Sequence, residues 1–366
     1  MFQIEITAQP GSAAILRLFS TASALPPLLL WFQVLRYANL QGSLSKSSWD
    51  NGRVKAAVHI AFSALAAFAC FPASLFAQAG QAPAQRQQPE FIRQGQQLIR
   101  EGKPEEALVL YRQMLQAQPL SLSANLAAGN VLDLMGKGEE ARKYFQKAID
   151  IAEKPEQKAS ANRAMAMSYA FEGSCKKAVE YEQKVLDFFA AAKDFFQQGE
   201  IADETARVCI DDGDLDTALR FYKEGHDAGL KEPDIKPARV DLWNFRWEHA
   251  QARIAARRGN LAEAQDHVTA AKAILDKGTN PEQAQFFPYL LGYVAFYGQD
   301  YKTAAEELLK SNQNDPFIQC LLGQTYEKLG EKDKAIESYR KAAAATAHNP
   351  PAAYAVPLAK KRLASI

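Results

Sequence analysis

A spacing of twelve residues between two small side chains recurs along most of this chain, and it limits the folds that the chain can adopt. Gly95 precedes Ala107 by twelve residues, and Gly129 precedes Ala141 by twelve, so the second pair is shifted by 34 from the first. Internal repeats of this length are typical of solenoids built from one supersecondary unit. The second small residue of each pair is Ala107, Ala141, Ala178, Ala218, Ala264, Ala304 or Ala335.

Larger residues stand at fixed offsets from these pairs. Tyr111 lies four residues after its alanine, and Phe145 lies at the same offset in the next repeat. We expect the small residues to let two helices approach closely, the aromatic ring to fill the gap to the next repeat, and a glycine to make the turn between helices. The predicted packing residues are Gly95, Ala107, Tyr111, Gly129, Ala141, Phe145, Gly292, Ala304, Gly323, Ala335 and Tyr339.

This pattern resembles the tetratricopeptide repeat family, whose units are helix pairs of 34 residues. The resemblance covers residues 89–350 and is strongest in the first two and last two repeats, because the intervals between the middle alanines are longer. It implies an all-α fold, a right-handed superhelical solenoid of about seven helix-turn-helix repeats. No segment alternates like a strand. Residues 351–366 are predicted to form a C-terminal capping helix whose basic residues, Lys360, Lys361 and Arg362, face water.

Residues 54–79 are typical of a secretory signal peptide. Arg53 and Lys55 supply positive charge, and residues 56–71 form an apolar run that only His59 and Ser63 interrupt. Ala77 and Ala79 give the small-residue pattern of a cleavage site. We therefore predict a bacterial periplasmic or secreted protein, and residues 80–88 are its linker. The alternative is an uncleaved membrane anchor at 54–76, the one case in which we expect a membrane association. Residues 1–53 are interpreted as untranslated in the cell, or else as a disordered extension.

The charge balance and the motifs favour no catalytic function. Lys and Arg total 43 against 42 for Asp and Glu, so no overall field favours nucleic acid. The five histidines lack metal-ligand spacing. Gly136 and Gly138 fit a turn between two helices better than a phosphate-binding loop. The aspartates from Asp211 to Asp216 are interpreted as a helix-capping turn rather than a calcium loop. We predict no enzyme, no cofactor, no metal and no nucleic-acid partner.

Three cysteines follow the predicted cleavage site, so they cannot all pair within the chain. Cys209 falls at a core position and is interpreted as a small buried hydrophobic residue. The alternative is a disulfide between Cys175 and Cys209, which lie in adjacent repeats.

The family resemblance also implies which residues line a binding groove on the concave face. In the fifth repeat the groove positions hold a basic stripe of Arg246, His249, Arg253 and Arg257. In the sixth they hold five aromatic residues: Phe286, Tyr289, Tyr293, Phe296 and Tyr297. Alternatively, the arginines pair with acidic neighbours such as Glu200, Asp203 and Asp211, and the aromatic rings pack against the next helix.

The predicted function is that of an exported scaffold, which binds a protein or peptide through this groove. The alternative is a non-catalytic accessory subunit of an envelope enzyme or assembly complex. Buried aromatic anchors contribute more to affinity than surface ion pairs do. We therefore expect Tyr293→Ala to weaken partner binding more than Arg253→Ala does.

Overall fold

The computed structural model describes residues 3–7, 15–19 and 88–366, which fall into two units, Met1–Gln85 and Arg86–Ile366. The predicted signal peptide at 54–79 lies outside the described residues. In the described part of the chain, no helix is both long and apolar enough to cross a membrane.

The described part of the first unit is a pair of antiparallel strands, β1 (Gln3–Thr7) and β2 (Ile15–Phe19). Gln3 lies opposite Phe19, and Thr7 lies opposite Ile15. The expectation that no segment forms a strand is therefore wrong for these residues. The signal was present, because two isoleucines alternate with Glu5 along β1 and β-branched residues favour strands.

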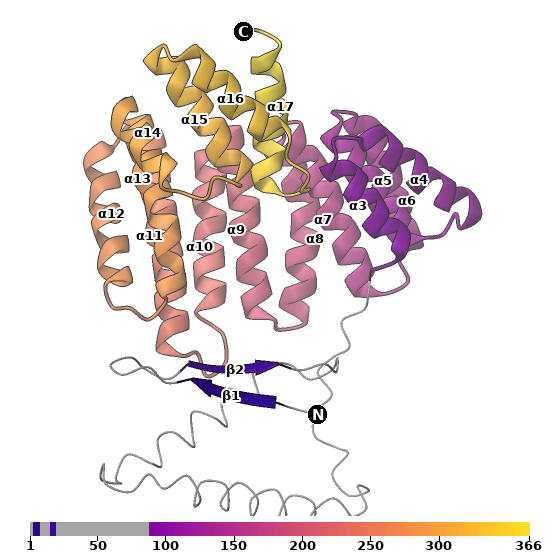
Figure 1. Cartoon of the computed structure of the whole chain (residues 1–366), viewed down its shortest axis with the longest axis horizontal. Helices are drawn as coiled ribbons and strands as arrows, with labels where there is room; N and C mark the ends of the chain where they lie inside the picture. Colours follow the sequence, from indigo (N-terminus) through magenta and orange to yellow (C-terminus); the bar gives the residue numbers. More distant parts are fainter. Residues whose placement is uncertain (1–2, 8–14, 20–87) are drawn as a thin grey trace, which may run out of the picture. The chain divides into compact units, whose positions relative to one another are not determined.

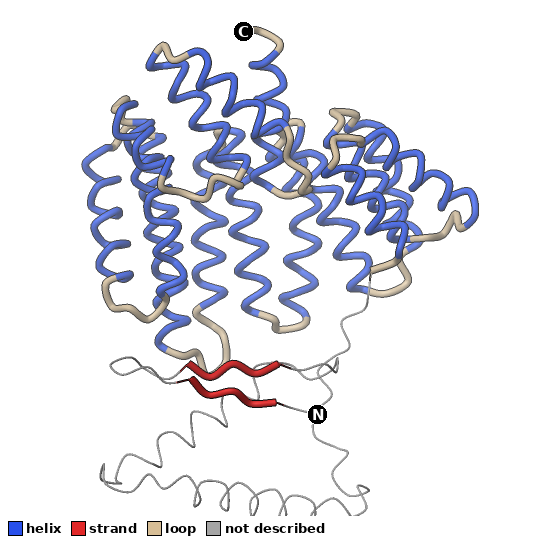
Figure 2. The backbone as a smooth tube through the Cα atoms, in the orientation of Figure 1, coloured by secondary structure: helices blue, strands red, loops and turns tan. Residues whose placement is uncertain are grey.

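The second unit is all-α in its described residues and consists of helices that pair in chain order (Figures 1 and 2). The predicted fold class, an all-α solenoid of helix-turn-helix repeats, is confirmed for this unit. The α-helices are α3 (Glu90–Arg100), α4 (Pro104–Ala117), α5 (Leu122–Leu134), α6 (Gly138–Ile151), α7 (Pro155–Phe171), α8 (Cys175–Ala191), α9 (Phe195–Asp212), α10 (Leu215–Gly229), α11 (Pro237–Arg257), α12 (Leu261–Leu275), α13 (Phe287–Tyr297), α14 (Tyr301–Leu309), α15 (Pro316–Leu329), α16 (Lys332–Ala343) and α17 (Pro350–Leu363), and a short 3₁₀ helix η1 (Pro281–Phe286) precedes α13.

Glycines at the first small position let an aromatic ring lie directly on the helix backbone. A Cβ placed on Gly129 would come within 2.4 Å of the Phe145 ring, and one on Gly323 within 2.6 Å of the Tyr339 ring. The ring therefore covers the glycine of its own repeat, and Phe145 also shares a core cluster with Met165 of the next repeat. All eleven predicted packing residues are buried.

The turns inside the helix pairs depend on glycines in the left-handed region of backbone conformation. Residues with a side chain rarely adopt a positive φ, so glycine ends these helices without strain. The glycines that do so have φ between 65° and 94°, and they are Gly102, Gly136, Gly173, Gly213, Gly259 and Gly330. The interpretation of Gly136 as a turn residue agrees with this geometry.

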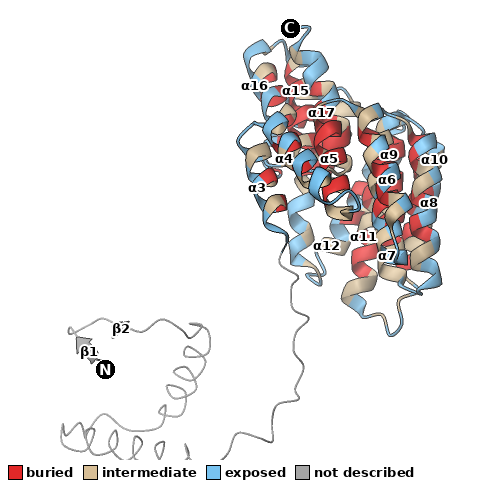
Figure 3. Cartoon of the chain, turned by 90° about the vertical axis from the view of Figure 1, so that its right-hand side faces the viewer, coloured by how far each residue is buried: buried red, intermediate tan, exposed pale blue. Residues whose placement is uncertain are grey.

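Helix α17 contacts two separate parts of the array. It packs beside α15 and α16 and also packs on α7 and α9, and its buried residues are red in Figure 3. The three basic residues predicted to face water, Lys360, Lys361 and Arg362, are all exposed. The ammonium group of Lys360 also donates a hydrogen bond to the carbonyl oxygen of Leu134 at 2.7 Å. The C-terminal helix therefore closes onto early repeats in addition to capping the last one.

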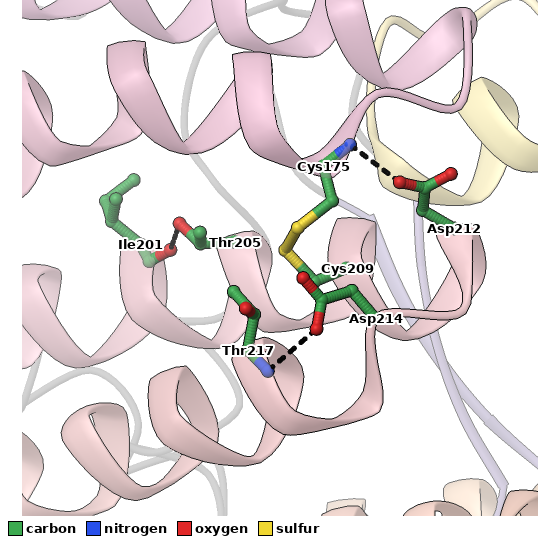
Figure 4. Close-up of a disulfide and its surroundings, with 7 residues drawn as sticks. All are labelled: Cys175, Ile201, Thr205, Cys209, Asp212, Asp214 and Thr217. Atoms are coloured by element: carbon green, nitrogen blue, oxygen red, sulfur yellow. Dashed lines mark hydrogen bonds between the residues drawn. A yellow bond between two sulfur atoms is a disulfide. The ribbon is translucent and has the colours of Figure 1, made fainter.

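A disulfide joins Cys175 at the start of α8 to Cys209 in α9, with 4.8 Å between their Cα atoms (Figure 4). The alternative prediction is thus confirmed, and the interpretation of Cys209 as an unpaired hydrophobic residue is wrong. The bridge therefore joins the second helix of one repeat to the first helix of the next. Nearby, the carboxylate of Asp214 caps α10 by accepting from the Thr217 amide at 3.1 Å, as the helix-capping interpretation expects.

Candidate functional site

A pocket of about 360 Å³ lies between helices from several repeats. Its walls come mainly from α9, α10, α11 and α13, together with η1 and the start of α15. Five of the nine predicted groove residues line it: Arg246, His249, Arg253, Phe286 and Tyr289. The structure therefore brings residues of the predicted basic stripe and of the aromatic set together around one cavity.

The basic stripe is a consequence of the length and spacing of α11. This helix begins at Pro237, whose fixed φ suits the first helical position, and runs for 21 residues. Arg246, His249 and Arg253 follow at intervals of three and four, so they share one helix face. Arg246 pairs with Glu200 and lies 4.0 Å from Asp203. Acidic neighbours therefore pair with Arg246, as the alternative interpretation of the basic stripe expects.

Arg253 has no carboxylate within ion-pair distance among the described residues. Its guanidinium donates to the hydroxyl of Tyr222 at 2.9 Å and, through Nε, to the carbonyl oxygen of His249 at 3.4 Å. The same group lies 5.1 Å from the centre of the Tyr222 ring. Since the residue is only 6 % exposed, these neutral contacts hold a buried positive charge.

Arg207 on α9 faces the same pocket and is less well satisfied. Its Nε atom is buried without a hydrogen-bond partner in the part of the chain that the structure describes. Its guanidinium lies over the Phe317 ring, 4.9 Å from the ring centre. Cation–π contact compensates part of the lost hydration, but it supplies no counterion.

Two carboxyl groups near these arginines have raised pKa values. Burial raises the pKa of Asp203 to about 7, against the opposing effect of Arg246. Burial also raises the pKa of Asp211 to about 7, although Arg207, Arg253 and Arg257 oppose it. One oxygen of Asp211 is buried and has no partner among the described residues. The charge of the site therefore changes near neutral pH.

His249 and Tyr289 present unused polar atoms to the pocket. His249 is 8 % exposed, and its Nε2 has no hydrogen-bond partner in the described region. Burial, assisted by Arg253 and Arg207, lowers the pKa of His249 well below its usual value, so the imidazole is neutral at pH 7. The Tyr289 hydroxyl is also buried without a partner there, and the two rings lie 5.5 Å apart.

The other predicted groove residues do not line the pocket. Tyr293 is fully buried in a core cluster with Phe317 from α15. Arg257 on α11 donates to the hydroxyl of Tyr297 at 3.0 Å, and Phe296 packs against the ring of Tyr301 on α14. These contacts match the alternative in which the rings pack against neighbouring helices. Phe286 differs from them, because it is 44 % exposed at the pocket.

Sequence reasoning missed Arg207 and Tyr222, although a signal for both was available. Arg207 follows Ala206, as Arg253 follows Ala252, so the two arginines occupy the same repeat position. Tyr222 stands four residues after its alanine, the offset that marks Tyr111 and Phe145. The start of α15 also contributes to the pocket. Its position there depends on how the array curves, so no local sequence signal identifies it.

A second polar cluster joins the end of the chain to early repeats. Asp133 on α5 accepts hydrogen bonds from the Ser168 hydroxyl at 2.9 Å and from His348 Nε2 at 2.8 Å. The His348 ring also stacks on Phe171 at 5.2 Å. Nucleophilic catalysis needs the base beside the hydroxyl, but here the carboxylate lies between the hydroxyl and the imidazole. This cluster fastens the C-terminal segment to the array.

Comparison with known proteins agrees with the repeat architecture. Models described as "Tetratricopeptide repeat" match residues 98–164 and residues 318–349, so the chain contains such repeats near both ends of the array. No curated protein matches the chain.

Solved repeat proteins resemble the chain at low sequence identity. A tetratricopeptide repeat protein from Parabacteroides merdae is 15 % identical, with a TM-score of 0.42 over 69 % of this chain and 91 % of that one. The apo form of RapI is 14 % identical, with a TM-score of 0.45 over 75 % and 98 %. The repeats of a putative kinesin light chain from Podosopora anserina are 17 % identical, with a TM-score of 0.42 over 51 % and 94 %.

Proposed function

We propose that this protein is an exported, non-catalytic scaffold that binds a protein or peptide at the pocket lined by Arg253, Tyr289 and Phe286. The observation that carries the proposal is the pocket itself. It combines an exposed aromatic side chain with buried polar groups that have no hydrogen-bond partner in the part of the chain that the structure describes. Aromatic and arginine residues in such a setting are the usual energetic centres of protein interfaces.

The size of the pocket indicates what part of a partner enters it. A volume of about 360 Å³ is at the lower end of ligand pockets and accommodates one or two side chains rather than a whole helix. An extended segment that places a side chain there would leave the rest of its length to contact neighbouring helices. Repeat solenoids with tetratricopeptide units supply such extended surfaces.

The disulfide supports the export part of the proposal. Disulfides persist in the periplasm and outside the cell, whereas cytosolic thiols are kept reduced. The Cys175–Cys209 bridge lies inside the array and is compatible with the secretory signal predicted at residues 54–79.

Site-specific photo-crosslinking in the native cell tests the proposal. A photoreactive phenylalanine analogue at Phe286 should give a discrete adduct with an envelope protein, because this side chain is exposed at the pocket. The same analogue at Leu309, which is 54 % exposed on α14 and lies outside the pocket, is the matched control. Equal adducts from both positions, or none from position 286, would contradict binding at the pocket.

The identity of the adduct also separates the two functional classes. A stoichiometric adduct with one envelope enzyme would indicate an accessory subunit. Several adducts that share a sequence feature would indicate a general peptide-binding scaffold. A chain recovered from the cytosol with Met1 at its start would contradict export.

A further inference from the structure

We propose that the pocket binds the carboxylate of an acidic peptide residue between Arg207 and Arg253, and that Asp203 takes up a proton when the carboxylate binds. This inference rests on the proposed function, because it names the chemistry of the segment that enters the same pocket. It adds a coupling to pH that the function itself does not require.

The first argument is that two arginines lack a directly paired carboxylate among the described residues. Neither Arg207 nor Arg253 has a carboxylate within ion-pair distance in the described region, although both line the pocket. Arg246, two turns before Arg253 on the same helix face, has Glu200 as its partner. A buried cation without a partner is unfavourable, and a carboxylate offers a guanidinium two parallel hydrogen bonds. An anionic ligand would therefore satisfy both charges.

The second argument is the set of unused polar atoms around the same space. The Nε of Arg207 and the hydroxyl of Tyr289 are buried donors with no partner among the described residues. His249 Nε2 is unpartnered as well, and it donates to an anion in the tautomer that carries the proton on this atom. These atoms belong to α9, α13 and α11, so they surround the pocket from different helices.

The charged and titratable groups around the pocket determine its response to pH. On α9, Asp203 lines the pocket and Asp211 lies close to the arginines. On α15, Asp315 caps the helix by accepting from the Phe317 amide at 2.8 Å. On α10, burial raises the pKa of Tyr222 to about 12, so its hydroxyl keeps its proton between pH 6 and 8.

The remaining groups come from α11 and α13. His249 is neutral throughout the range from pH 6 to 8, because burial and the arginines lower its pKa. Tyr289 keeps its proton there, because burial raises its pKa. The arginines stay charged. Asp203 and Asp211 are therefore the groups whose charge changes over this range.

The direction of the pH effect follows from these two acids. Both have a pKa of about 7, so at pH 8 both are mostly negative and offset the arginines. At pH 6 both are mostly neutral, so the positive charge in the pocket attracts an anion more strongly. If one acid must be protonated for binding, the affinity is expected to be about tenfold higher at pH 6 than at pH 8.

Calorimetric titration of the full chain with short peptides tests this inference. The first probe is a capped alanine pentapeptide with a central glutamate, and its glutamine analogue is the neutral control. An alanine pentapeptide with a free C-terminus tests a terminal carboxylate, and inorganic phosphate tests a free anion. We expect the glutamate peptide to bind more tightly at pH 6 than at pH 8. At pH 8, where Asp203 is mostly ionised, binding should take up a proton, measured as a binding heat that depends on the ionisation heat of the buffer.

Variants locate the effect on the named groups. Asp203→Asn should keep the pH 6 affinity at pH 8, and it should reduce the proton uptake. Asp216→Asn is the matched control, because Asp216 is highly exposed and pairs with Arg258 away from the pocket. Arg253→Met should abolish binding, and circular dichroism shows whether this variant folds. If it does not fold, Asp203→Asn and the glutamine peptide still decide the question.

Three results would overturn the inference. They are equal affinity for the glutamate and glutamine peptides, equal affinity at pH 6 and pH 8, and no binding by any probe at about 1 mM. If only phosphate or only the free C-terminus binds, the acidic-residue assignment is wrong. A crosslink from position 286 would persist in each case, so failure of this inference is distinguishable from failure of the proposed function.

Discussion

One repeat position holds an apolar residue on α7 but a positively charged residue on α9 and on α11. Met167 on α7 follows Ala166, and it occupies the position that Arg207 and Arg253 occupy in the next two repeats. Met167 is buried in a cluster with Ala352, Ala353 and other residues of α17, whereas the two arginines line the pocket. We call the side of α7 that packs under α17 the covered region, and the sides of α9 and α11 that line the pocket the open region. The residue type at this one position differs between the two.

The energetics explain why α17 covers only the first of these regions. Burial of a methionine side chain contributes about 1.5–3 kcal/mol, and the alanines of α17 permit close approach to α7. The same apolar helix placed over Arg253 would strand a charge without a partner, which is strongly unfavourable. The covered region is therefore a structural contact, and the open region retains unused polar atoms.

The largest expected effect concerns the disulfide, which joins α8, the neighbour of α7, to α9, whose side chains line the pocket. Cys175 and Cys209 close a loop of 34 residues, and a crosslink of this length stabilises a fold by about 3–4 kcal/mol in the chain-entropy model. Reduction should lower the free energy of unfolding by that amount, measured by urea denaturation with and without reductant.

The double variant Cys175→Ala/Cys209→Ala is the control for this prediction. It should match the reduced protein in stability, and reductant should have no effect on it. An equal denaturation midpoint for the wild-type chain with and without reductant would contradict a stabilising bridge.

A second prediction tests whether α17 is held by apolar contact with the early repeats. Val356 is buried in the same cluster as Met167 and Phe171. Val356→Asn would place an unpaired amide there, and this should lower the free energy of unfolding by about 2–3 kcal/mol. Lys361→Asn, at an exposed position of the same helix, should change it by less than about 0.5 kcal/mol. Equal effects of the two variants would show that α17 docks loosely.

The sequence predicts contacts between residues of the same repeat, but it does not predict contacts between residues far apart in the chain. The spacing of Gly129, Ala141 and Phe145 predicts the helix pairing, because each contact lies within one repeat. The hydrogen bond between His348 and Asp133 joins residues 215 positions apart, and no local pattern encodes it. The covered region was therefore not predictable, because it depends on the curvature accumulated over all the repeats.

The candidate site was predictable in part for the same reason. His249, Arg253 and Tyr289 were identified from repeat positions on single helices. Tyr293 shares the aromatic pattern but is buried by Phe317 from a later repeat. The expected ranking of Tyr293→Ala over Arg253→Ala stays a prediction, but loss of this core ring would also lower stability. Phe286 is the aromatic residue at which binding can be tested without that complication.

The smallest expected effect concerns a buried acid on α8, which packs between α7 and α9. Glu182 stands four residues after Ala178, the offset at which Tyr111, Phe145 and Tyr339 supply aromatic rings. It is fully buried, and neither carboxylate oxygen has a hydrogen-bond partner in the described residues. The nearby Arg163 is bound to Glu204 at 2.8 Å. Burial, with a further contribution from Glu204, raises the pKa of Glu182 well above its usual value.

A raised pKa in the folded state means that the native protein favours the protonated form of Glu182. The free energy of unfolding should therefore decrease as pH rises from the unfolded pKa of about 4.5 through the folded one. Glu182→Gln removes the charge, so it should stabilise the protein by about 1–2 kcal/mol at pH 8 and by much less at pH 5. Glu180→Gln, at an exposed position on the same helix, should show no such dependence. Thermal melts of both variants at the two pH values measure the difference. If Glu182→Gln stabilised the protein equally at pH 5 and pH 8, Glu182 would be ionised in the folded state over this whole pH range. The interior beside α7 would then hold an unpaired negative charge, and the contrast with the charged pocket of the open region would no longer stand.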